Sequence, residues 1–241
     1  MYFVANWKMY GNLKSINTLN KVIKFSKSKE IKKGRLIYCP PYTLISSFYK
    51  KFENCLIDIG AQNCHESDSY GSHTGSINSS MLKSVGANYV ILGHSENRKK
   101  GETDKLINLK IKSAIKAKLK VIFCIGETLV ERKRGKTRLI ISKQIRLGLD
   151  KIKKKSNLFI AYEPVWSIGT GVIPKPKELE QTIKFIQKKF KSKLPKILYG
   201  GSVNPQNISD LKKITSLDGF LIGGASQSPK KFIDIVKKTF N

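Results

Sequence analysis

Short apolar runs alternate with longer amphipathic stretches along the whole chain. The apolar runs have the lengths of strands and occupy residues 2–6, 36–39, 57–61, 89–93, 120–125, 158–163, 197–199 and 219–222. The stretches between them place apolar residues at helical spacing, most clearly over residues 15–27, 104–118, 137–154, 177–191 and 229–239. Runs such as Val90-Ile91-Leu92 are apolar throughout, which is typical of a parallel sheet covered on both faces.

Eight strands, each followed by a helical segment, predict an α/β fold with a parallel sheet. The chain has 241 residues, 40% of them hydrophobic, so we expect residues 1–241 to form a single domain. A closed (β/α)8 barrel, with eight parallel strands inside and helices outside, fits a length of roughly 250 residues. A doubly wound open sheet is the alternative. It normally has a Gly-x-Gly-x-x-Gly turn after its first strand, whereas here that strand ends in Asn6-Trp7-Lys8-Met9-Tyr10-Gly11.

The formal net charge of +29 makes nucleic-acid binding an alternative function. However, few of the 46 basic residues are arginine, the residue that nucleic-acid readers use to grip phosphates and bases. The lysines are spread over the chain, mostly on predicted outer helix faces. We therefore expect no specific nucleic-acid partner, only weak attraction to polyanions.

Other classes of protein are disfavoured by what the chain lacks. No apolar run approaches the roughly 18 residues that span a bilayer, and the N-terminus reads as a strand rather than a signal peptide. No cysteine belongs to a C-x-x-C pair, and His65 and His73 have no ligand spacing, so neither a metal nor a cofactor is expected. Reduced thiols in a cytoplasmic protein are expected at Cys39, Cys55, Cys64 and Cys124.

Polar and glycine residues follow five of the eight predicted strands. In a barrel of this kind, functional groups gather at the C-terminal ends of the strands. These ends carry Asn6-Trp7-Lys8, Gly93-His94-Ser95-Glu96, Glu163, Tyr199-Gly200-Gly201-Ser202 and Gly223-Gly224-Ala225-Ser226. The five groups are predicted to converge on one mouth of the barrel.

Glu163 is the candidate general base. It ends an apolar strand and is followed by Pro164-Val165-Trp166 and then by Gly169-Thr170-Gly171, a segment that can bend. A strand-end carboxylate beside a loop able to close over it is how a general base is shielded from water. A lone glutamate at a strand end is otherwise an ordinary solvated charge, so this hypothesis depends on the residues around it.

Asn6, Lys8 and His94 are candidate partners of that base. Asn6 and Lys8 alternate at a strand end, which predicts that both side chains point the same way, and a cation there could hold an anionic substrate. His94 precedes Ser95-Glu96, which resembles a helix start, and the positive end of a helix disfavours imidazolium. A neutral His94 could donate to a carbonyl oxygen. The alternatives are a solvated lysine and a packed histidine.

Two glycine pairs, at 200–201 and 223–224, follow the last two strands. Barrels of this kind bind phosphate at that place through backbone N–H groups. Ser202 adds a hydroxyl, and a helix after Gly224 would add its dipole. The set predicts a phosphate site that needs no metal, although each pair alone would be an ordinary turn.

Taken in order, the motifs are similar to those of triosephosphate isomerase from one end of the chain to the other. The matching segments are Asn6-Trp7-Lys8-Met9, Gly60-Ala61-Gln62-Asn63, Gly93-His94-Ser95-Glu96, Cys124-Ile125-Gly126-Glu127-Thr128, Tyr162-Glu163-Pro164-Val165-Trp166, Gly169-Thr170-Gly171, Tyr199-Gly200-Gly201-Ser202-Val203 and Gly223-Gly224-Ala225-Ser226. Each tetrapeptide alone is a weak signal, but the ordered set is specific.

The resemblance implies a TIM barrel that interconverts D-glyceraldehyde 3-phosphate and dihydroxyacetone phosphate, a reaction of glycolysis and gluconeogenesis. It implies that Glu163 is the base, that His94 is the electrophile, and that Lys8 stabilises negative charge, positioned by Glu96. Asn6 would help to position the substrate, and residues 164 to 174 would form a lid. The phosphate would be bound by Gly169, Ser202, Gly223 and Gly224. A barrel with the same phosphate site and different chemistry would be expected to lose Glu163, His94 or Lys8, and none is lost. The alternative function is a phosphate-binding barrel with weak, nonspecific polyanion binding.

The resemblance also implies a homodimer, and the departures from the family pattern lie near its expected interface. Ser76 replaces the usual acid of Gly-x-x-Thr-Gly-Glu, and Asn97 replaces the usual base of Ser-Glu-Arg-Arg. If that acid and base meet between subunits, both halves of one ion pair are missing, and no buried charge is left unpaired. Thr74 is retained and should insert near Asn6 and Lys8 of the other subunit. Ser167 replaces a lid alanine, and Tyr10 replaces an asparagine of the first loop; neither is expected to touch the chemistry.

Overall fold

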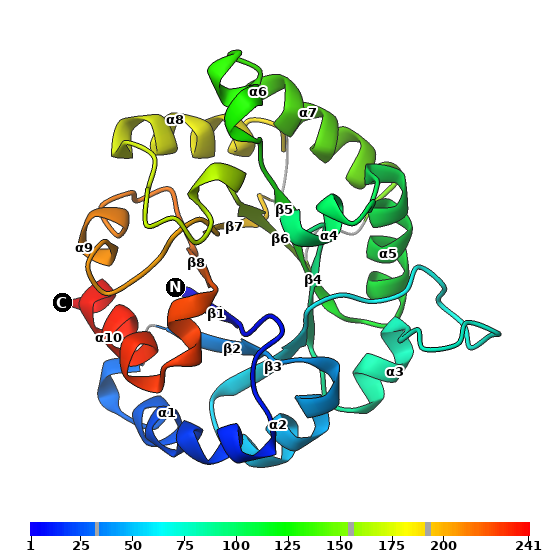
Figure 1. The fold of residues 1–241 in the computed structure, drawn as a ribbon, viewed down its shortest axis with the longest axis vertical. Coiled ribbons are helices and arrows are strands. Elements are labelled where there is room, and N and C mark those ends of the chain that lie inside the picture. Colours follow the sequence, from blue (N-terminus) through cyan, green and yellow to red (C-terminus); the bar gives the residue numbers. More distant parts are fainter. Residues whose placement is uncertain (32–33, 154–156, 191–193) are drawn as a thin grey trace.

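Eight parallel strands form a closed barrel at the centre of the molecule, and the helices surround it (Figure 1). This computed structural model describes residues 1–31, 34–153, 157–190 and 194–241. The strands are β1 (Tyr2–Asn6), β2 (Arg35–Cys39), β3 (Ile57–Ala61), β4 (Tyr89–Leu92), β5 (Lys120–Ile125), β6 (Leu158–Tyr162), β7 (Lys196–Tyr199) and β8 (Gly219–Ile222). All eight predicted strands are present, with ends that agree to within one residue.

The pairing of β1 with β8 closes the barrel. Tyr2 pairs with Gly219 and Ala5 with Ile222, in parallel register. Each other strand pairs with its neighbour in the sequence, so the strand order is the chain order. The barrel prediction is therefore confirmed, and the open-sheet alternative is excluded.

Two apolar layers explain why the strands are apolar on both faces. Val4, Ile122 and Cys124 belong to a small buried cluster to which alternate strand residues contribute, and we identify it as the barrel interior. Residues between them, such as Phe3 and Phe123, join the larger cluster that packs against the helices. Period-two alternation thus buries both faces of each strand.

The helices follow the strands as expected, but their ends differ from the prediction. The helix predicted over 104–118 is α5 (Asp104–Lys116), and that over 229–239 is α10 (Pro229–Phe240). The one predicted over 137–154 is α7 (Thr137–Gly148), and that over 177–191 is α8 (Pro176–Gln187); residues 154 and 191 lie outside the described residues. Positive φ angles at Lys118 and Lys151 turn the chain away after α5 and α7.

The helix predicted over 15–27 is divided. A 3-10 segment, η1 (Leu13–Leu19), precedes α1 (Asn20–Ser26). The Thr18 hydroxyl donates to Ser15 O, an example of the local side-chain bonding that weakens an α-helix. The other helical segments are η2 (Lys29–Ile31), η3 (Tyr42–Leu44), α2 (Ile45–Lys51), α3 (Ser79–Ser84), α4 (Ser95–Lys99), α6 (Leu129–Lys133), η4 (Val165–Ser167), α9 (Ile208–Leu211) and η5 (Gly224–Gln227).

One connection extends beyond the ring of helices. The segment between β3 and α3 projects outward in Figure 1, and its residues 68–75 are exposed. At the base of this segment, the backbone N–H of His65 donates to the carbonyl oxygen of Ile77 at 2.8 Å. This segment carries Thr74, the residue expected to reach a second subunit.

Candidate active site

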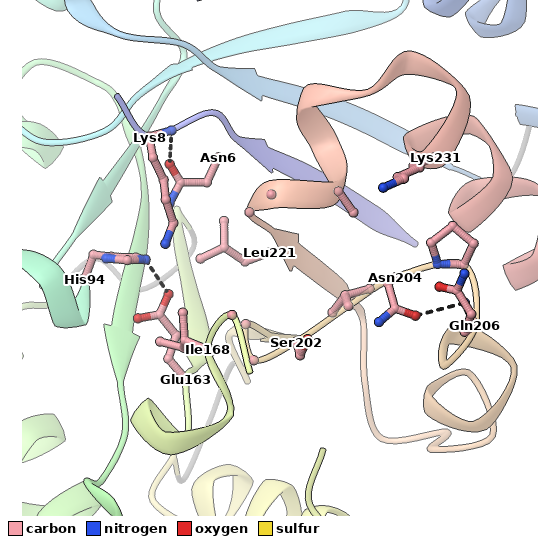
Figure 2. Close-up of a pocket in the computed structure, with 18 residues that line it drawn as sticks. Asn6, Lys8, His94, Glu163, Ile168, Ser202, Asn204, Gln206, Leu221 and Lys231 are labelled. Atoms are coloured by element: carbon pink, nitrogen blue, oxygen red, sulfur yellow. Dashed lines mark hydrogen bonds and ion pairs between the residues drawn. The ribbon is translucent and has the colours of Figure 1, made fainter. Parts of the chain in front are cut away.

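A cavity of about 270 Å³ lies at the C-terminal ends of the strands. The sequence-predicted site residues Asn6, Lys8, His94, Glu163, Gly169, Ser202, Gly223 and Gly224 all line it. Glu96 lines an adjoining groove that shares Asn6, Lys8 and His94 with the cavity. Figure 2 shows Lys8, His94 and Glu163 pointing toward one another at one end of the cavity. The structure therefore brings the predicted site residues together.

Lys8 enters the cavity through an unusual backbone conformation. β1 ends at Asn6, and Lys8 has φ of 55°, a left-handed conformation that costs a non-glycine residue about 1 kcal/mol or more. The Lys8 N–H donates to Asn6 Oδ1 at 3.2 Å, and Gln62 Nε2 donates to Lys8 O at 2.8 Å. Asn6 and Lys8 both line the cavity, as predicted. However, Lys8 is directed there by a turn that two hydrogen bonds stabilise, and not by the alternation of side chains along a strand.

Glu96 holds the ammonium group of Lys8. Lys8 Nζ donates to Glu96 Oε1 at 2.6 Å. Burial raises the pKa of the Glu96 carboxyl, but the hydrogen bond from Lys8 and the positive charges nearby, those of Lys8 and Lys100 among them, outweigh it and lower the pKa below its usual value. Glu96 is therefore ionised at neutral pH, and its contact with Lys8 fixes a cation at the cavity wall.

α4 begins at Ser95, where the sequence predicts a helix start, and His94 is its N-cap. Its Nδ1 accepts the Glu96 N–H at 3.2 Å, so Nδ1 carries no proton and the neutral ring carries its proton on Nε2. Nε2 lies 3.4 Å from Glu163 Oε1. This tautomer aims an N–H donor into the cavity, where it can meet a substrate oxygen.

Glu163 lies at the end of β6 and is only 2% exposed. The Ser95 N–H donates to Oε2 at 3.4 Å, while Oε1 has no hydrogen bond with any described residue. A Cβ on Gly200 would lie 2.7 Å from Glu163 Cγ, and a Cβ on Gly126 would lie 1.8 Å from the Glu163 carbonyl oxygen. The two glycines leave room for this carboxylate, which has one oxygen free to accept a proton.

The same cavity has the features expected of a phosphate site. Ser202, Gly223 and Gly224 line it, and a Cβ added at Gly224 would meet nothing within 4 Å, so its backbone is open to a ligand. The helix expected after Gly224 is a single 3-10 turn, η5, and α10 begins only at Pro229. So short a helix has little dipole, and the backbone N–H groups themselves must supply the attraction.

The segment predicted to form the lid begins in a well-anchored stretch. Trp166, in η4, donates from Nε1 to Glu127 Oε1 at 3.3 Å, and the fully buried Glu127 also accepts from Tyr162 Oη at 3.1 Å. Arg132 stacks on the Trp166 ring at 4.8 Å and lies 3.4 Å from Glu127. The tip, with positive φ at Gly169, is exposed. The lid thus has a fixed base and a glycine tip.

Three polar residues of the cavity were not predicted from the sequence. Asn204, Gln206 and Lys231 line the cavity, and Figure 2 shows the Lys231 ammonium group facing it. Among the described residues, Lys231 forms no ion pair. Lysine is unfavourable in the first turn of a helix because the N-terminus is positive. A lysine in the first turn of the helix predicted over 229–239 was therefore the sequence signal that could have identified Lys231 as a candidate ligand-binding residue.

The described part of the chain has neither a cluster of potential metal ligands nor a helix that could span a membrane. No group of three or more His, Cys, Asp or Glu side chains is placed there to hold a metal ion. No helix in the same ranges has the length and apolar character to cross a membrane. All four cysteines are free, and Cys39 and Cys124 are buried among the apolar residues of the barrel interior.

Comparison with known proteins gives one consistent family. The model of the triosephosphate isomerase family matches residues 1–239. The triosephosphate isomerase of Thermodesulfovibrio yellowstonii is 43% identical over 98% of each chain, and that of Dictyoglomus thermophilum is 42% identical over 97% of each. The crystal structure of the Bartonella henselae triosephosphate isomerase superposes with a TM-score of 0.88 at 34% identity, covering 98% of both chains.

Proposed function

The chain belongs to the triosephosphate isomerase family, whose members interconvert D-glyceraldehyde 3-phosphate and dihydroxyacetone phosphate in glycolysis, and from this premise we propose how its residues carry out that reaction. Glu163 is the base, His94 is the electrophile, and Lys8 stabilises negative charge. The observation that supports these roles is the convergence of the three side chains, from three separate strand ends, on one cavity.

The proton transfers follow from the positions of the side chains. With dihydroxyacetone phosphate bound, the Glu163 carboxylate takes a proton from C1, and the C–H electron pair forms a C1–C2 double bond while the C2 carbonyl oxygen becomes an enediolate oxygen. His94 Nε2–H donates to that oxygen and moves a proton between the two enediolate oxygens. Glu163 then returns its proton to C2, leaving an aldehyde at C1. A carboxylate base paired with a neutral histidine is the known mechanism of this family.

Lys8 and Asn6 support this chemistry through charge and position. The Lys8 ammonium, held by Glu96 at 2.6 Å, offsets negative charge on the enediolate without needing to reorganise. Asn6 Oδ1 accepts the Lys8 N–H and so helps to keep the turn that places this cation. Asn6 and Glu96 therefore act partly through Lys8.

Phosphate binding keeps the intermediate in the site. Ser202, Gly223 and Gly224 hold the phosphate, and the Gly169 N–H joins them when the lid moves over the cavity. A closed lid excludes water and prevents the enediolate from eliminating phosphate. The presence of these groups on the wall of the cavity that also holds Glu163 supports this role.

The assignment is tested by measuring the interconversion of the two triose phosphates by the purified chain. Rapid conversion in both directions is expected at low salt. A folded protein without this activity would contradict the proposal.

The positive charge of the chain is expected to accelerate substrate capture. The substrate carries a phosphate of charge near −2, so kcat/KM should fall as ionic strength rises, because salt screens attraction beyond about 10 Å. Lys231→Gln removes a charge at the cavity and should lower kcat/KM about three- to fivefold at low salt. Lys230→Gln removes the same charge from the neighbouring exposed position and is the matched control. A flat salt profile, or equal effects of both substitutions, would contradict this prediction.

The active unit is proposed to be a homodimer in the cytoplasm. A groove lined by Met9, Tyr42, Asn97 and Lys100 opens beside Lys8 and His94, and Met9 is 95% exposed. Further large apolar side chains are exposed at Tyr10 and Leu13, and Tyr70 is exposed in the projecting segment. An apolar surface around a groove supports a protein interface there. In the proposed dimer, the projecting segment that carries Thr74 docks into this groove of the other subunit. The free thiols support a cytoplasmic location.

Restoring the missing ion pair is expected to tighten the dimer. Ser76→Glu combined with Asn97→Arg should lower the dissociation constant about tenfold, because close charge pairs at interfaces couple by roughly 1.5 kcal/mol or more. Each single substitution should weaken the dimer, since it adds a charge without its partner. Sedimentation equilibrium of the parent and the three variants measures these changes. A parent chain that is strictly monomeric and fully active would contradict the dimer itself.

A further inference from the structure

The lid contains a buried hydroxyl, that of Ser167, which accepts a hydrogen bond from the backbone of Ser202 in the cavity wall. Ser167 Oγ donates to Val172 O at 2.5 Å, lies 2.9 Å from Tyr199 Oη, and accepts the Ser202 N–H at 3.3 Å. A serine hydroxyl has one proton and two lone pairs. Because Val172 O can only accept and the Ser202 N–H can only donate, Tyr199 Oη is the donor in the remaining contact. All three capacities of the hydroxyl are therefore used.

Tyr199 is suited to that donor role. Burial raises its pKa to about 12, despite an opposing contribution from Ser167, so the phenol keeps its proton at neutral pH. Ser167 is fully buried, so water does not substitute for these partners. Ser167 was not expected to touch the chemistry, and its hydroxyl accepts the backbone N–H of Ser202, a residue of the proposed phosphate site.

The bonds of Ser167 hold the lid in one conformation. The bond to Val172 O joins the two ends of the lid tip, and within it Thr170 Oγ1 donates to Trp166 O at 3.3 Å. A Cβ added at Gly169 or Gly171 would meet nothing within 4 Å, so there is open space beside both glycines of the tip. In this conformation the lid is a bonded unit, attached to the cavity wall at Ser202.

We propose that Ser167 is a positioning residue that stabilises this lid conformation by competing with the substrate phosphate for the Ser202 N–H. This inference rests on the proposed function, in which Ser202 binds phosphate. A charged phosphate oxygen is a stronger acceptor than a neutral hydroxyl. Phosphate binding takes the Ser202 N–H, removes one of the three bonds of Ser167, and so favours movement of the lid. Phosphate capture and lid movement are coupled through this N–H group.

Removing the hydroxyl should strengthen phosphate binding. In Ser167→Ala the Ser202 N–H is unpaired before the ligand arrives, so phosphate no longer displaces an existing bond. The dissociation constant of inorganic phosphate, measured by calorimetry, should fall on the order of fivefold, the effect of one neutral hydrogen bond. Ser167→Cys keeps a group of similar size that is a weaker donor and acceptor. Its dissociation constant for phosphate should lie between those of the parent and Ser167→Ala. If the substitution instead damaged the packing of the lid, phosphate binding would weaken and the dissociation constant would rise.

Thr182→Val is the matched control. It removes a hydroxyl of α8 that donates to Glu178 O at 2.9 Å, outside the lid and the cavity, so the dissociation constant of phosphate should stay within about twofold of the parent value. Unchanged or weaker binding in Ser167→Ala would overturn the inference, as would a parent chain that does not bind phosphate. Turnover of triose phosphates by the parent, measured alongside, tests the proposed function separately, because the calorimetric result does not depend on catalysis.

Discussion

Glu163→Gln is expected to lower kcat about 10³- to 10⁴-fold, with only a few-fold change in KM for either triose phosphate. Glutamine has nearly the same size and can still receive the Ser95 N–H, which lies 3.4 Å from Oε2 in the parent. It cannot accept the proton from carbon. The proposed phosphate contacts at Ser202, Gly223 and Gly224 are untouched, so substrate binding should persist. Initial rates in both directions, with saturation curves, separate the two effects.

Glu163→Asp is the companion variant for this prediction. It keeps a carboxylate but withdraws it by about 1 Å, and a misplacement of that size costs about 10²-fold. We expect its kcat to lie between those of the parent and Glu163→Gln. Near-normal turnover in Glu163→Gln would exclude the base role. Equal losses in both variants, with lowered thermal stability, would show that the carboxylate matters only for packing against Gly200.

His94→Asn is expected to lower kcat about 10²- to 10³-fold, the usual effect of losing one donor to a developing oxyanion. Asparagine is a strong N-cap residue, so its side chain can replace Nδ1 as the acceptor for the Glu96 N–H and preserve the start of α4. It is too short to replace the Nε2–H donor, which lies 3.4 Å from Glu163. The measurement is kcat with each substrate.

Thermal unfolding of His94→Asn is the control. An intact N-cap should keep the unfolding temperature within a few degrees of the parent value, since losing a cap costs about 1 kcal/mol. A stable variant with kcat within threefold of the parent would mean that His94 serves only as the cap of α4.

Much of the fold and of the candidate site could be predicted from local patterns. Strand positions followed from short apolar runs, and the barrel followed from their number and alternation with helices. Glu163, His94 and the glycine pairs could be selected because each directly follows a strand, and all parallel strands end at the same mouth. The order of motifs then identified the family, since an ordered set over the whole chain is far more specific than any one of them.

The sequence by itself thus determined the barrel, the family and the residues at the mouth, because these depend on periodicity and on order along the chain. Only the tertiary structure decided how those residues meet. Lys8 reaches the cavity through a left-handed turn, Lys231 arrives from α10, and Ser167 bonds to Ser202 across 35 residues of sequence. Contacts of this kind depend on the register of distant strands and on single side-chain rotamers. No local pattern in the chain encodes them, so they become visible only when the strands are paired.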